Sequence, residues 1–78
     1  HFVAFALGRV GRRAGGATAA KVGRFLVSWL GRTHDALVRS FILRGMGVLA
    51  LPDLVGAIRP WLGRKALPEA AEALVRCG

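Results

Sequence analysis

The chain has 78 residues, of which 54% are hydrophobic, and twelve basic against four acidic residues give it a net charge of +8. This length allows one domain with a marginal core, so the surplus apolar side chains must face a lipid, a partner or another copy of the chain. One cysteine excludes an internal disulfide, and the absence of asparagine, glutamine and tyrosine argues against an enzyme and against base-specific DNA readout.

The segment from Phe2 to Arg13 predicts a first helix that Gly8 and Gly11 weaken. Its apolar start, followed by arginines, is typical either of an organellar targeting segment or of a retained amphipathic helix, and the start at His1 suggests a processed product or an internal fragment. The glycines up to Gly16 serve equally well as a small-residue packing face or as helix breaks. We expect a flexible break near residues 14–18.

The clearest helix is expected from Ala19 to Leu30, where apolar residues recur at helical spacing. Gly31 is expected to end it in a left-handed conformation, and Thr33 to cap the next helix. That next helix has Asp35 spaced to pair with Arg39. Its end, or a loosening of its last turns, is expected at two further glycines, Gly45 and Gly47.

Prolines mark the remaining elements. Pro52 predicts the first position of a short helix that Pro60 ends, and Pro68 predicts the start of a last helix with a Glu72–Arg76 pair. No stretch alternates as a strand does, so the sequence predicts an all-α fold, a compact bundle of four or five short helices forming a single domain over residues 1–78. A membrane span over residues 41–58 is disfavoured because Arg44, Pro52 and Asp53 interrupt it.

Catalytic and metal sites are not predicted. His34 and Asp35 are adjacent and do not face each other on a helix, no second metal ligand lies at suitable spacing, and Cys77 is expected to be a free thiol at a frayed end. We therefore expect no enzyme activity, no cofactor and no metal.

The basic residues indicate an anion-binding surface, because residues 1–34 contain no acid and ten of the twelve basic residues are arginine. Trp29 and Trp61 each precede Leu-Gly-Arg, as interfacial anchors beside phosphate-binding arginines would, although a core position is an equal alternative. The predicted membrane- or anion-binding residues are Arg9, Arg12, Arg13, Lys21, Arg24, Arg32, Trp29 and Trp61.

The leading hypothesis is a membrane-associated cationic protein that binds anionic lipid. In composition and architecture, though in no motif, the chain is similar to secreted bacteriocins that form compact helical bundles. It departs from them in having arginines in place of lysines and in its three prolines. The alternative is a small accessory subunit of a membrane complex, for instance in an organellar inner membrane, that packs on larger subunits or on itself. Nucleic-acid binding ranks third, since charge alone supports it.

Overall fold

The computed structural model describes residues 2–62 and 68–78, and within them every regular element is helical. The predicted all-α bundle of four or five helices is confirmed. The elements in chain order are α1 (Phe2–Ala14), α2 (Gly16–Arg32), α3 (Ala36–Leu49), the 3-10 helix η1 (Pro52–Leu54), α4 (Val55–Ile58), the 3-10 helix η2 (Arg59–Trp61) and α5 (Pro68–Cys77).

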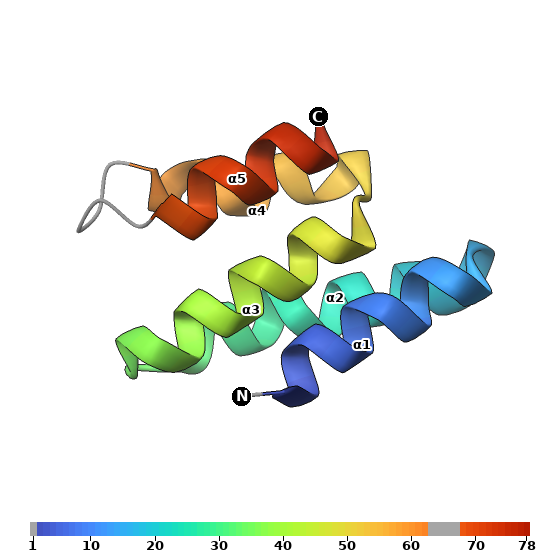
Figure 1. The fold of residues 1–78 in the computed structure, drawn as a ribbon, viewed down its shortest axis with the longest axis horizontal. Helices are drawn as coiled ribbons and strands as arrows, with labels where there is room; N and C mark the ends of the chain where they lie inside the picture. Colours follow the sequence, from blue (N-terminus) through green and yellow to red (C-terminus); the bar gives the residue numbers. More distant parts are fainter. Residues whose placement is uncertain (1, 63–67) are drawn as a thin grey trace.

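Helix α3 is the centre of the bundle. It lies between α1 and α5, while α2 packs on α1 and α3, and the short α4 packs on α5 (Figure 1). The bundle measures 32 × 23 × 16 Å. Its largest fully buried side chains come from α2, α3 and α4, and they are Leu26, Leu30, Ile42, Leu43, Met46 and Ile58.

The break between α1 and α2 lies where the glycine pair predicts it. Gly15 and Gly16 have φ angles of 64° and 52°, in the region that side chains with a Cβ rarely adopt. The chain therefore reverses direction with no intervening loop, and α2 begins at Gly16, three residues before the predicted start.

The predicted caps between α2 and α3 are wrong. Gly31 is helical, and α2 runs on to Arg32 with Thr33 as its C-cap. Asp35 is the N-cap of α3, because its Oδ1 accepts hydrogen bonds from the amides of Leu37 at 2.8 Å and Val38 at 3.3 Å. Thr33 Oγ1 accepts only the amide of Asp35, at 3.3 Å. Two good capping residues lie two positions apart, and the second, Asp35, accepts the amides of the first turn of α3.

The expected ion pair between Asp35 and Arg39 does not form. The Arg39 guanidinium instead lies over the Trp61 ring, 5.0 Å from the ring centroid. The carboxylate of Asp35 is engaged with the helix amides, so a cation–π contact takes the place of the pair.

Gly45 and Gly47 neither end nor interrupt α3, contrary to expectation. The helix continues to Leu49 and ends at Ala50, which has a left-handed conformation with φ of 55°. Both glycines lie where neighbouring helices cross: Gly45 contacts the backbone of α1 near Ala4, and a Cβ on Gly47 would lie 3.2 Å from Ala73 Cα of α5. Their role is close helix approach, which outweighs the helix propensity that glycine lacks.

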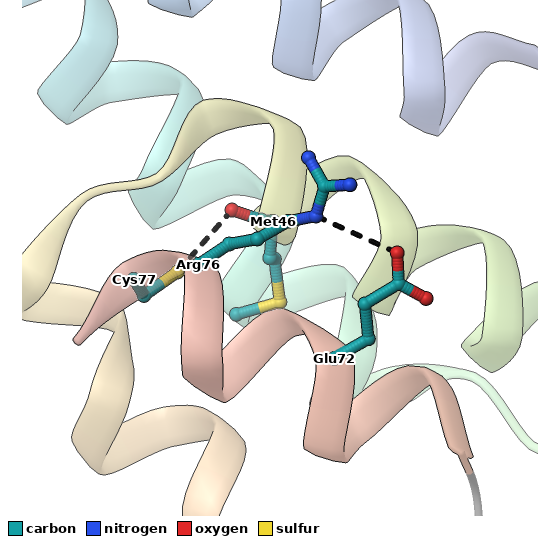
Figure 2. A network of polar contacts seen from close by, with 4 residues as sticks. All are labelled: Met46, Glu72, Arg76 and Cys77. Carbon is teal, nitrogen blue, oxygen red and sulfur yellow. Dashed lines mark hydrogen bonds and ion pairs between the residues drawn. The ribbon is translucent and has the colours of Figure 1, made fainter.

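The C-terminal helix is anchored, which corrects the expected frayed end. Cys77 is a free thiol as predicted, but it is buried, and its Sγ donates a hydrogen bond to the Met46 carbonyl oxygen at 3.4 Å (Figure 2). The predicted Glu72–Arg76 pair is present, with Arg76 Nε 3.5 Å from Glu72 Oε1. Pro68 begins α5 as expected, whereas Pro52 and Pro60 lie in the 3-10 helices that flank α4.

None of the helices in residues 2–62 and 68–78 is both long and apolar enough to cross a bilayer.

Candidate anion-binding surface

Helix α1 buries small residues and exposes most of its large apolar ones, which is the reverse of the usual arrangement. The residues it buries are the small Ala4, Gly8 and Gly11, which recur at i, i+4 and i+7 and so form one helix face. A Cβ on Gly8 would overlap the Gly45 carbonyl group, and a Cβ on Gly11 would lie 2.7 Å from Leu49 Cδ1. Helix α1 is therefore held against α3 by backbone contact and contributes no large side chain to the fully buried core.

Most of the large apolar side chains of α1 face outward, and only Leu7 packs, partly buried, against the core. Phe2 is 87% exposed, Val3 59% and Val10 57%, whereas Phe5 is 37% exposed. An ordinary surface helix turns such residues towards the core and leaves its polar face in water. An exposed face this rich in apolar side chains is typical of a surface that a membrane or a protein partner covers.

Three arginines of α1 surround one shallow groove. Arg9, Arg12 and Arg13 line it together with Val48 of α3, and its volume is about 390 Å³. Their spacing of three and four residues places them on neighbouring positions of the helix surface. Side chains with a carboxylate are absent from this lining, which consists of three arginines and one apolar residue.

The acidic side chains of α5 line a different groove. This second groove, about 320 Å³ in volume, lies between α1, α3 and α5, and Val48 belongs to the lining of both grooves. Here the charges are paired: Arg44 lies 3.9 Å from Glu69, and Arg76 pairs with Glu72. Of the arginines that line these two grooves, only those of α1 take part in neither ion pair.

The other predicted cations are exposed but do not join the arginine groove. Lys21, Arg24 and Arg32 lie along α2. Arg24 lines a separate groove of about 420 Å³ whose lining also includes Asp53, and Arg32 Nε donates a hydrogen bond to the Ser28 carbonyl oxygen at 3.3 Å. These residues add exposed positive charge along α2 without building a common site.

The two tryptophans are half-buried and pack against the core. The Trp29 ring lies 5.8 Å from that of Phe25, centroid to centroid, and Trp61 lies under Arg39. The aromatic side chains most open to solvent are instead those of Phe2 and Phe25, the latter 48% exposed.

Sequence reasoning identified the three arginines of the groove but missed Val48 and the exposed apolar residues of α1. The small residues at 4, 8 and 11 were the available signal, because a helix that buries them must turn Phe2 and Val10 outward. Val48 gave no such signal, since only the crossing of α1 and α3 brings it to the arginines.

Within the described part of the chain, no cluster of three or more histidine, cysteine or carboxylate side chains could hold a metal ion. Comparisons with known proteins yield no matching family, characterised protein or solved structure.

Proposed function

We propose that this protein binds anionic membranes through the outer face of α1. The observation that carries the proposal is the reversed packing of this helix, which exposes Phe2, Val3 and Val10 while it buries alanine and glycine. The arginines that follow on the same helix supply the charge that anionic headgroups attract.

The two halves of α1 favour binding by different means. Full burial of a side chain such as Phe or Val stabilises a complex by roughly 1.5–3 kcal/mol, and these side chains are already exposed, so no core contact is lost on binding. Each arginine near an anionic surface adds about 1 kcal/mol. The apolar half therefore sets affinity for the acyl boundary, and the cationic half sets preference for anionic lipid.

Vesicle co-sedimentation tests the proposal. We expect binding to phosphatidylcholine vesicles that contain the anionic lipid phosphatidylglycerol, and far weaker binding to vesicles of phosphatidylcholine alone. Arg9→Gln, Arg12→Gln and Arg13→Gln together should weaken binding on the order of 100-fold, since three charges contribute about 3 kcal/mol. Phe2→Ser with Val10→Ser should also weaken it.

A matched control separates the α1 surface from net charge. The control variant Lys21→Gln, Arg32→Gln, Arg59→Gln removes an equal number of positive charges, from exposed positions outside the groove. This control should reduce affinity much less than the α1 triple variant. Equal losses in the two variants, or equal binding to neutral vesicles, would reject α1 as the binding surface.

Dye release extends the proposal to membrane activity. A membrane-active antimicrobial protein should release an entrapped dye from anionic vesicles at the protein-to-lipid ratios at which it binds. Binding with no release would retain lipid association and reject the antimicrobial role.

An accessory subunit of a membrane complex is the second candidate function. It is favoured by apolar residues exposed outside α1, Leu37 at 62% on α3 and Val75 at 79% on α5, which are available to a protein partner. Sedimentation velocity without lipid tests it: concentration-dependent association that Leu37→Ser and Val75→Ser abolish would support a protein-facing surface. A monomer at all concentrations favours the lipid-binding function.

A further inference from the structure

We infer that the groove formed by Arg9, Arg12, Arg13 and Val48 is a binding site for a phosphomonoester group. The inference rests on the proposed function, since the same arginines attract the membrane, and it specifies the headgroup that they select. It begins from the placement of charge: three arginines line one groove, and no aspartate or glutamate does.

The arginines of the neighbouring groove are already paired with carboxylates. In the neighbouring groove, which shares Val48, Arg44 and Arg76 are paired with the two glutamates of α5. Those carboxylates are thus engaged on the far side of Val48, and neither ion pair involves an arginine of α1. The α1 groove therefore combines three arginines with no carboxylate in its lining, whereas the neighbouring groove holds both charges.

The donor chemistry favours a monoester over a diester. Each guanidinium presents a planar fork of N–H donors that binds phosphate oxygens in pairs. A phosphomonoester offers three terminal oxygens and between one and a half and two negative charges near neutral pH, roughly the value for a phosphorylated side chain. A diester offers two such oxygens and about one charge, so it leaves more of the three arginines unmatched.

The positive charges of these arginines repel one another and are not compensated within α1. Arg9 lies three and four residues before Arg12 and Arg13, spacings at which like charges repel, and α1 has no acidic residue to offset them. Arg12 and Arg13 benefit from the negative end of the helix dipole in the last turn, whereas Arg9 lies a turn earlier. A doubly charged group in the groove removes this repulsion.

The test compares two lipids at equal surface charge. Phosphatidylcholine vesicles that contain phosphatidic acid, a monoester, or phosphatidylglycerol, a diester, are adjusted to the same zeta potential, and binding is measured by co-sedimentation. We expect at least about tenfold tighter binding to phosphatidic acid, a preference of the size that one added charge-assisted hydrogen bond supplies. The Arg9→Gln, Arg12→Gln, Arg13→Gln variant should lose this preference, and the Lys21→Gln, Arg32→Gln, Arg59→Gln control should keep it.

A soluble probe separates the sources of the group. Inorganic phosphate, titrated while the amide resonances of α1 are followed by NMR, should shift residues around the groove in the wild type and not in the α1 triple variant. Such shifts without binding to either vesicle would retain the phosphate site and reject the membrane function. Equal affinity for the two lipids, with no shift on addition of phosphate, would overturn the inference while leaving anionic-membrane binding intact.

Discussion

Gly8 of α1 and Gly45 of α3 touch backbone to backbone. A Cβ on Gly8 would overlap the Gly45 carbonyl oxygen, and a Cβ on Gly45 would overlap the Ala4 carbonyl oxygen. This contact sets the distance at which α1 crosses α3, and with it most of the large apolar side chains of α1, Leu7 apart, point away from the bundle. The exposed apolar face of α1 is therefore a consequence of the glycine contact.

Gly8→Ala should destabilise the fold by at least about 2 kcal/mol, because the added methyl group must displace the α3 backbone and a close-packed contact does not relax cheaply. Urea unfolding followed by circular dichroism measures the effect. Gly31→Ala is the matched control: Gly31 is helical, and a Cβ there meets nothing within 4 Å, so stability should rise by roughly 0.5–1 kcal/mol. A neutral Gly8→Ala variant would contradict the close contact.

Asp35→Ala should cost about 1 kcal/mol, since it removes the side chain that accepts the two amide hydrogen bonds at the start of α3. Asp35→Asn should restore most of this loss, because the amide oxygen is also a good cap. Thr33→Ala, at the residue that the sequence predicted as the cap, should have a smaller effect. Thermal unfolding of the three variants ranks them, and a larger loss for Thr33→Ala would reverse the assignment.

The sequence predicted the helices well where an apolar stripe recurs, as from Val22 to Leu30, and it predicted α5 from Pro68. It failed where local rules compete with packing. Gly45 and Gly47 resemble helix breaks because glycine disfavours a helix by about 1 kcal/mol, but close contacts with α1 and α5 outweigh that penalty.

The sequence predicted the arginines of the candidate site but not the rest of the groove. The clustering of Arg9, Arg12 and Arg13 follows from their spacing on one helix. Which face of α1 is buried, and that Val48 completes the groove, depend on a tertiary crossing that periodicity does not encode.

Leu26→Ala and Phe2→Ala should differ sharply, because burial and not side-chain size determines the contribution to stability. Leu26 is fully buried in the core, so its truncation should cost about 2–5 kcal/mol. Phe2 is largely exposed, so its truncation should change the free energy of unfolding by no more than about 0.5 kcal/mol. Chemical denaturation measures both, and a loss of several kcal/mol for Phe2→Ala would mean that α1 packs with its apolar face inward.

Cys77 should make stability depend on alkaline pH. Burial raises the pKa of its thiol and outweighs the opposing effect of a hydrogen bond from the Leu51 backbone. Below the pKa of an unfolded cysteine, about 8.5, both states keep the proton. As pH rises past that value, the unfolded chain loses its proton first, so the free energy of unfolding falls.

Comparison with Cys77→Ala isolates this effect from the titration of lysine and the other groups. The variant should be less stable than the wild type at pH 7, because it removes a buried sulfur and its hydrogen bond to the Met46 carbonyl oxygen, which keeps only the Ala50 amide as donor, and the difference should shrink towards pH 10. A thiol-specific reagent at pH 8 should modify the native protein at least about tenfold more slowly than the urea-unfolded chain, since a buried thiol is neither accessible nor ionised. Equal rates would mean that the last turn of α5 is detached from α3.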